Sequence, residues 1–396
     1  MVKYNFDTVY SRPDSEKWME QRRKFGVDGL VSLWEADMDF QSPEPVVQAL
    51  VDRAKTGIYG YVHKPETYNH AIIEWISRRH GWTPQTEWLL HSPMLMTAVL
   101  LYLKRFCAPE DKVVFQTPIY YPFYDVVKYA GREALFNPLI HNEKTCRYNM
   151  DFDNLEQQFQ KGGKVFILCN PHNPAGMVWT REELLHLGQL CQKYDVRVIA
   201  DEAHADFTFH GHTYTPFASL GEDFRHRSMT LLSPGKTFNL AGTHQAVIII
   251  PDPETRAEMG KQIGMLDIEK NNCFSLVAVE AGYRGGEDWL RQAMAYIETN
   301  MEYVIHFCRE QIPEIKAVKP EGTYLMWLDC RGFGFSSGDE LGKFMTHRAH
   351  VGLCEGYWFG EQGAGFERLN VACPRSVLAQ AMEQIANAAE ELRRRK

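Results

Sequence analysis

The chain has 396 residues, 44% of them hydrophobic and 12% aromatic, which is enough for a large core shared by two or three domains. Its 43 basic and 51 acidic residues give a net charge of -8, and the longest basic run is the terminal RRRK. Nucleic acid and anionic membranes are therefore not expected partners.

The N-terminal segment MVKYNFDTVYSRPD lacks the apolar stretch of a signal peptide. The longest aliphatic run, AVIIIP at 246–251, is far shorter than the roughly 20 residues that cross a bilayer. Nine dispersed cysteines without a C-x-x-C pair are typical of reduced thiols rather than of disulfides or a zinc site. We therefore expect a cytoplasmic protein with no membrane segment and no metal.

Short, continuously apolar runs alternate with helical segments between about residues 85 and 250. Strands that are apolar throughout are buried on both faces, which predicts an α/β fold with a mostly parallel sheet covered by helices. The clearest helix, TREELLHLGQLCQKYD, begins with a capping box of Thr180 and Glu183. The strand-like runs are KVVF (112–115), KVFILCN (164–170), VRVIAD (196–201), SMTLLS (228–233) and QAVIIIP (245–251).

The pattern changes after about Gly286. A long helical segment covers 287–312, the strand-like TYLMWLDC covers 323–330, and a last helix covers 376–396. These elements predict a smaller α+β domain at 287–396. We assign 46–286 to the large domain and 1–45 to an N-terminal arm that also contributes to the small domain.

Polar segments follow three of the predicted strands. They are NPHNPAG from Asn170, DEAHAD from Asp201 and SPGKTFN from Ser233. The intervals between Asn170, Asp201 and Lys236 each suffice for a strand, helix and strand unit of about 30 residues. Since ligands bind beyond the carboxyl ends of parallel strands, we expect these segments to share one pocket.

Lys236 fits three unrelated chemistries: the end of a phosphate-binding loop, the S-x-x-K of serine acyl-transferases, and a Schiff-base lysine. The first needs a glycine where Thr230 stands. The second needs S-x-N and then K-T-G after the serine, but the only K-T-G is at 55–57 and no S-x-N occurs. A Schiff-base lysine with an aspartate on a neighbouring strand is what pyridoxal 5'-phosphate (PLP) enzymes require. A solvated surface lysine is the remaining alternative.

The segments NPHNPAG, DEAHAD and SPGKTFNLAG together resemble the fold-type I PLP-dependent aminotransferase family, class I/II, in order and spacing. LWEADMDF, YGY at 59–61, TPIYYPFY and RLNVACPRS are similar to one subgroup, the bacterial cystathionine β-lyases or C-S β-lyases. The resemblance covers nearly the whole chain. It implies a seven-stranded type of sheet in a large PLP-binding domain, and a homodimer whose active site is shared between subunits.

The resemblance implies that Lys236 binds PLP as a Schiff base and then moves the substrate Cα proton. The lowered pKa of a desolvated lysine suits that task. Asp201 would pair with the pyridine nitrogen, with a helix N-cap as its alternative role. Arg368 would bind the substrate carboxylate, assisted by the backbone at Ala36.

The resemblance also assigns the groups around the cofactor ring. Asn173 would donate to the phenolic oxygen, or merely shape a turn. His204 occupies the place of a tyrosine that many relatives use for the same oxygen, with a core histidine as its alternative. Tyr120 would stack on the ring and take part in catalysis, with Tyr121 as the competing assignment.

The cofactor phosphate would be held at a helix N-terminus. The expected groups are Ser233, the backbone N-H groups of Leu95 and Met96, and Tyr61 from the partner subunit, which would also take part in catalysis. A packed turn is the alternative role of Tyr61. His244 stands where many aminotransferases have an arginine, and we expect it to contact the phosphate.

The expected reaction is α,β-elimination on L-cystathionine or a related sulfur amino acid, giving a thiol, pyruvate and ammonia. The principal alternative is an aminotransferase, because the same pocket residues serve both reactions. A regulator that keeps the fold and binds another protein is the third possibility. An intact Lys236, Asp201 and Arg368 disfavours it.

Overall fold

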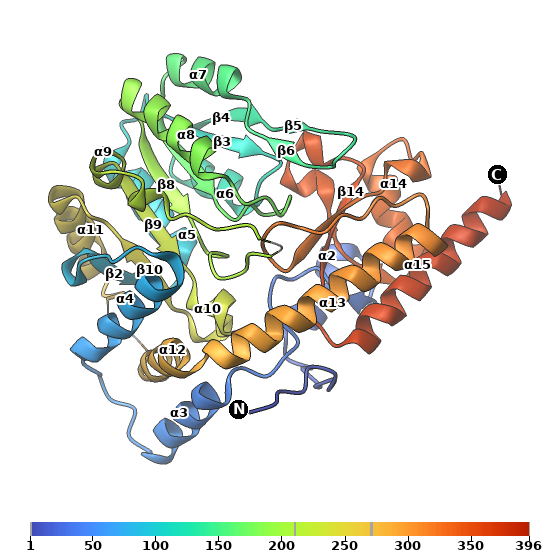
Figure 1. Ribbon diagram of the computed structural model, residues 1–396, viewed down its shortest axis with the longest axis horizontal. Helices are drawn as coiled ribbons and strands as arrows, with labels where there is room; N and C mark the ends of the chain where they lie inside the picture. The colour runs from blue at the N-terminus through green and yellow to red at the C-terminus, as the bar shows by residue number, and fades with distance from the viewer. Residues whose placement is uncertain (1, 210, 270–271, 396) are drawn as a thin grey trace.

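The computed structural model describes residues 2–209, 211–269 and 272–395, and its centre is a seven-stranded sheet (Figure 1). Neighbouring strands are parallel except at β10, which runs antiparallel to both of its neighbours. The predicted mostly parallel α/β sheet is therefore confirmed. In sheet order the strands are β2 (Leu89–Ser92), β10 (Ala246–Ile249), β9 (Ser228–Leu232), β8 (Arg197–Asp201), β7 (Gly163–Cys169), β3 (Lys112–Thr117) and β4 (Glu133–Pro138).

The reversal of β10 follows from what connects it to β9. Only α10 (Pro234–Thr237) and the 3-10 turn η3 (Ala241–Thr243) lie between the two strands. A four-residue helix rises about 6 Å, which is too short to carry the chain back along the sheet for a parallel return. The chain therefore turns back antiparallel directly after the segment that contains Lys236.

Helices cover both faces of the sheet because its central strands are apolar on both sides. One face packs mainly against α7 (Phe152–Gln160), α8 (Arg181–Lys193) and α9 (Glu222–His226). The other packs mainly against α5 (Leu95–Phe106), α6 (Pro122–Tyr129) and α11 (Pro253–Met265). Three further helices, α3 (Glu44–Lys55), α4 (Glu66–His80) and α12 (Cys273–Gly285), cover the β2 and β10 end of the sheet.

The predicted capping box at the start of α8 is present. Thr180 Oγ1 accepts from the backbone N-H of Glu183 at 3.1 Å, and Glu183 Oε2 accepts from the backbone N-H of Thr180 at 2.8 Å. Leu184, Leu187 and Cys191 are buried on one side of the helix. The cap fixes where α8 begins, and therefore how the chain returns from β7 to β8.

The C-terminal part contains a small antiparallel sheet of order β11-β14-β13 with two long helices lying side by side, α13 (orange) and α15 (red) in Figure 1. The N-terminal arm joins it, because β1 (Val31–Ser32) pairs in parallel with β12 (Val351–Gly352). The domain boundaries at 45 and 286 stay a prediction. The remaining bounds are α1 (Glu16–Met19), α2 (Gln21–Phe25), β5 (Ile140–His141), β6 (Tyr148–Asn149), α13 (Glu287–Gln311), β11 (Leu325–Asp329), α14 (Gly338–Lys343), the π-helix η5 (Phe344–Arg348), β13 (Cys354–Glu355), β14 (Phe366–Asn370) and α15 (Arg375–Arg395).

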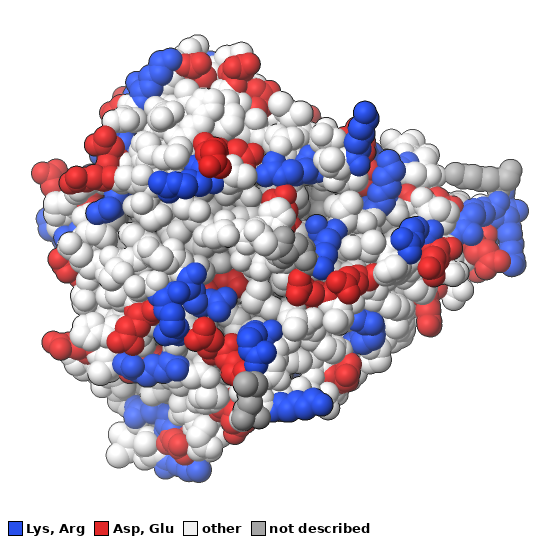
Figure 2. Space-filling model, viewed as in Figure 1, with Lys and Arg blue, Asp and Glu red and all other residues white. Residues whose placement is uncertain are grey.

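The surface shows no long stretch of one charge on the face drawn in Figure 2, where acidic and basic side chains are interspersed among the described residues. No helix in the described ranges is long and apolar enough to cross a membrane. The described residues also contain no cluster of histidine, cysteine, aspartate and glutamate arranged to hold a metal ion.

Candidate active site

One cavity of about 330 Å³ lies at the carboxyl ends of β7, β8 and β9. The parallel register places Cys169 beside Asp201 and Asp201 beside Leu231, so the segments that follow these strands leave the sheet at one edge. The cavity brings together ten of the twelve predicted site residues: Ala36, Leu95, Met96, Tyr120, Asn173, Asp201, His204, Ser233, Lys236 and Arg368.

Lys236 projects into this cavity from α10. The Ser233 side chain caps α10 by accepting from the backbone N-H of Lys236 at 3.3 Å. Gly235 leaves room for the turn, since a Cβ there would lie 3.1 Å from Ala241 Cα. The Nζ atom of Lys236 donates to the carbonyl of Ala36 at 2.6 Å. Burial lowers the pKa of Lys236, and Glu35 opposes the shift, so the neutral amine is more accessible than in water.

Asp201 ends β8 as a buried carboxylate. Its Oδ1 accepts from the backbone N-H of Ala203 at 3.2 Å, and no described cationic side chain forms an ion pair with it. Burial raises the pKa of Asp201 to about 6. A positively charged ring nitrogen at this carboxylate would supply the missing partner and bring the pKa down again.

His204 is a buried neutral histidine that also lines the cavity. Its pKa is lowered well below the ordinary value by burial first, and then by the charges of Lys236 and Arg368. Its Nδ1 atom has no hydrogen-bond partner among the described residues. The ring meets Tyr324 edge to face at 5.5 Å, and the Tyr324 hydroxyl donates to the Ala36 carbonyl at 2.8 Å. A buried ring nitrogen without a described partner, on a residue that lines the cavity, fits a ligand oxygen.

Arg368 is a buried guanidinium on β14 that faces no carboxylate within the described chain. Nη1 donates to Asn173 Oδ1 at 3.0 Å, and Nη2 donates to the Trp34 carbonyl at 2.8 Å and to Cys354 Sγ at 3.0 Å. Its Nε atom has no described partner, and the group lies 5.0 Å from the Phe359 ring centroid. A buried cation with only neutral partners is suited to bind an anionic ligand.

The first turn of α5 also lines the cavity. Met94 is the N-cap residue and makes no side-chain cap hydrogen bond. The backbone N-H groups of Leu95 and Met96 therefore belong to the uncapped turn of a twelve-residue helix whose dipole favours an anion there. This part of the cavity lining fits a phosphate group.

Tyr61 and His244 do not line the cavity. Tyr61 is 97% exposed in the loop between α3 and α4, and His244 is exposed in the left-handed conformation at φ 53° after η3. Their contacts with the cofactor stay predictions. Tyr120 and Tyr121 both line it, with ring centroids 5.6 Å apart, so stacking by Tyr120 also stays a prediction.

Sequence reasoning missed Glu16, Glu35 and Gln245, which also line the cavity. Glu35 lies within the LWEADMDF motif and accepts from the backbone N-H of Ala36 at 3.1 Å. Gln245 directly follows His244. Glu35 and Gln245 are therefore each adjacent to a residue that the sequence did indicate, and this adjacency was the signal that could have found them. Glu16 lies on α1, and no motif in the sequence indicates it.

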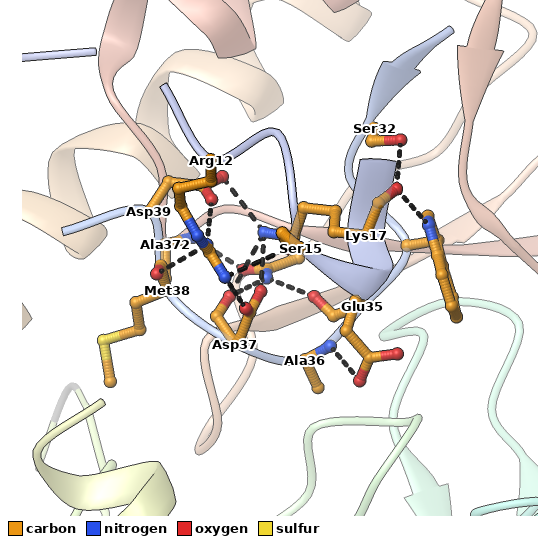
Figure 3. A network of polar contacts seen from close by, with 12 residues as sticks. Arg12, Ser15, Lys17, Ser32, Glu35, Ala36, Asp37, Met38, Asp39 and Ala372 are labelled. Atoms are coloured by element: carbon orange, nitrogen blue, oxygen red, sulfur yellow. Dashed lines mark hydrogen bonds and ion pairs between the residues drawn. The ribbon is translucent and has the colours of Figure 1, made fainter. Parts of the chain in front are cut away.

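A buried network of charges holds the loop that carries Trp34 and Ala36 (Figure 3). The ammonium of Lys17 is fully buried and contacts Asp37 Oδ1 at 2.8 Å and Asp39 Oδ2 at 3.0 Å. Arg12 pairs with the same two carboxylates, reaching Asp39 Oδ1 at 2.7 Å. The N-terminal arm thereby fixes a loop whose carbonyls contact Lys236 and Arg368.

These groups fit PLP, and they place the protein in the class of PLP-dependent enzymes of fold type I. The amine of Lys236 suits a Schiff base, Asp201 a pyridinium nitrogen, His204 and Asn173 a ring oxygen, and the first turn of α5 a phosphate. Residues 29–385 match the family model described as aminotransferase class I and II, and the chain belongs to this family. The expected family is therefore confirmed.

Individual relatives are similar over nearly the whole chain. Cystathionine beta-lyase PatB of Bacillus subtilis is 40% identical over 384 residues, covering 96% of this chain and 98% of that protein. The PLP-containing crystal structure of cystalysin from Treponema denticola has a TM-score of 0.95 at 32% identity, covering 99% of this chain and 100% of that chain. The PLP-bound C-S lyase from Staphylococcus hominis has a TM-score of 0.91 at 30% identity, covering 98% of both chains.

Proposed function

We propose that the protein is a PLP-dependent C-S β-lyase that acts on L-cystathionine or a related sulfur amino acid. We choose a lyase because the chain is similar to cystathionine beta-lyase PatB over nearly its full length, at 40% identity. The cavity supports the cofactor class, because Lys236, Asp201 and Arg368 converge there from separate elements.

When bound, PLP supplies an electron sink for the electron pair released at the substrate Cα. Lys236 Nζ takes the Cα proton, and its lowered pKa makes the neutral base more available than that of a solvated lysine. Arg368 holds the substrate carboxylate through its guanidinium, so that the Cα-H bond is presented to Lys236. Asp201 keeps a positive charge on the ring nitrogen by pairing with it.

The overall reaction balances without an oxidant or a second substrate other than water. The Cα-H bond breaks with its proton passing to Lys236, and the Cβ-S bond breaks with its electron pair leaving on sulfur. The thiolate takes up a proton, and the three-carbon remainder adds water and loses ammonia to become pyruvate. No 2-oxo acid acceptor is needed, which separates this reaction from transamination.

We also propose a cytoplasmic homodimer with a shared active site. Tyr61 lies outside its own cavity at 97% exposure, next to Ile58 at 75% and Tyr59 at 56%, so this loop presents an apolar surface suited to a partner subunit. Nine free cysteines agree with a reducing compartment.

The test is to incubate purified protein with L-cystathionine and no 2-oxo acid, and to follow pyruvate and free thiol. Elimination predicts that both products accumulate in equal amounts over many turnovers. An aminotransferase would stop after about one turnover per active site and resume only when a 2-oxo acid is added. Absence of both products would refute the proposed lyase activity on this substrate.

A further inference from the structure

The ammonium of Lys24 lies among aromatic rings beside the catalytic cavity. Its Nζ is 4.2 Å from the ring centroid of Trp358, 4.8 Å from that of Tyr121 and 5.3 Å from that of Trp34. The rings come from separate parts of the chain: η6 (Gly356–Phe359), the start of α6, and the loop after β1. Cation–π attraction and the surrounding rings hold this long side chain in one place.

Tyr121 connects Lys24 to the reaction centre. It lines both the catalytic cavity and a surface depression of about 590 Å³ that Lys24 and Trp358 also line. Trp34 forms a second link, because its ring lies near Lys24 while its carbonyl accepts from Arg368 at 2.8 Å. Because Tyr121 lines both, the depression adjoins the cavity in which Arg368 would bind the substrate carboxylate.

Lys24 is held in place by aromatic rings rather than by a direct ion pair. Burial raises the pKa of the Glu355 carboxyl, and the charge of Lys24 opposes that shift without such a contact. Within the part of the chain that the structure describes, the Lys24 ammonium donates a hydrogen bond to the Tyr121 hydroxyl at 3.5 Å and forms no ion pair with a carboxylate. The preceding Arg23, which lines the same depression, pairs with Glu20 instead. An oriented ammonium without a direct carboxylate contact is suited to receive a carboxylate through a charge-assisted hydrogen bond.

We infer, resting on the proposed lyase function, that Lys24 with Trp34, Tyr121 and Trp358 forms a subsite for a carboxylate carried by the leaving thiol. Two cations then bind the two ends of the substrate. Arg368 binds the carboxylate of the reacting amino acid, and Lys24 binds the carboxylate of the leaving group. The preferred substrates are thioethers whose leaving group ends in a carboxylate, rather than simple alkyl cysteines.

Charged residues at the rim of the depression further define the kind of leaving group that it would bind. Asp125 and Glu361 line it and are exposed, so a positive charge on the same leaving group is also accommodated. A leaving thiol that ends in an amino acid carries both charges. This matches the thiol half of L-cystathionine better than a dicarboxylate would.

The experiment compares kcat/KM for pyruvate formation from L-cystathionine, S-(2-carboxyethyl)-L-cysteine and S-propyl-L-cysteine. The variant Lys24→Met keeps an unbranched apolar side chain against the rings and removes the charge. The control Arg23→Met removes the neighbouring charge, which is already paired. We expect Lys24→Met to lower kcat/KM about tenfold for the two substrates with a distal carboxylate, mainly through KM, and to change the S-propyl value less than about twofold. Arg23→Met should change all three values less than about twofold.

An equal loss for all three substrates in Lys24→Met would overturn the inference by showing a general structural role. Unchanged values for all three would overturn it as well, while leaving the lyase activity intact. If the wild-type protein forms pyruvate from none of the substrates, the proposed function itself is refuted, and the inference falls with it. The wild-type measurement therefore separates the two failures.

Discussion

Replacing Lys17 by methionine is expected to destabilise the protein strongly, because it removes one cation from the buried network in Figure 3. The Lys17 side chain is 0% exposed, and its two partners are 17% and 13% exposed. Methionine fills much of the same space, so the main loss is the charge, and two largely buried carboxylates are left with Arg12 alone. Removing one partner of a buried ion pair lowers the free energy of unfolding by about 3–5 kcal/mol.

The assay is equilibrium urea unfolding at one fixed protein concentration, since association would shift the midpoint. Lys343→Met is the matched control, because Lys343 forms an exposed pair with Asp339 at 66% and 65% side-chain exposure. Because exposed ion pairs contribute little to stability, it should leave the urea midpoint close to that of the wild type. A Lys17→Met protein as stable as this control would refute the argument that the network is a buried and interdependent unit.

The same network predicts a pH dependence with a definite sign. Burial alone would raise the pKa of Asp37, but Lys17 and Arg12 outweigh it and hold that pKa below its ordinary value. A carboxylate with a depressed folded-state pKa adds stability above its unfolded pKa of about 3.9, and this stability is lost as the pH falls through the folded value. The difference between wild type and Lys17→Met should therefore shrink below about pH 4. A difference that stays constant down to pH 3 would contradict the assignment.

Three further predictions concern the cavity. Lys236→Ala should lose the visible absorbance of covalently held PLP and lower pyruvate formation by at least about a thousandfold, and a variant with wild-type absorbance would contradict the role of this lysine. Arg368→Lys should raise KM about tenfold or more with a smaller effect on kcat, because lysine lacks the planar fork, and steady-state kinetics with an unchanged KM would exclude that role. In the PLP-free protein, burial raises the pKa of Asp201 to about 6, so its ionisation lowers stability as the pH rises from about 4 to 6. Asp201→Asn should then unfold at higher urea than wild type at pH 7 and at similar urea at pH 4, and equal midpoints at pH 7 would be inconsistent with a destabilising buried charge.

The sequence was most informative where a strand is buried on both faces. The runs that became β7, β8 and β9 are apolar throughout, and the polar segments after them converge because parallel register aligns their ends. The strand β4 was not predicted because it is an edge strand with partly exposed positions. The direction of β10 has no signature in hydrophobic periodicity, and only its short connection through α10 explains it.

Part of the site could be predicted because its residues follow buried strands. The prediction was incomplete because other residues are positioned by the N-terminal arm. Asp201 and Lys236 follow apolar runs, and Arg368 and Ala36 were found through the resemblance alone. Glu35 and Lys24 do not follow a predicted strand, unlike Asp201 and Lys236. Their positions depend on how the N-terminal arm packs beside the cavity. That fold is set by contacts between distant residues, such as Lys17 with Asp39, which no local pattern encodes.

The loop at 34–39 explains why charges rather than apolar side chains anchor the arm. Its backbone must present the Trp34 carbonyl to Arg368 and the Ala36 carbonyl to Lys236 at 2.8 Å and 2.6 Å. Apolar packing of similar volume can be as stable as a buried ion pair, but it tolerates sliding by a residue. Asp37 and Asp39 are each matched to both Arg12 and Lys17, so a shift by one residue would leave buried charges unpaired. The network therefore fixes the register of the loop, and through it the orientation of Lys236 and Arg368, on which the proposed chemistry depends.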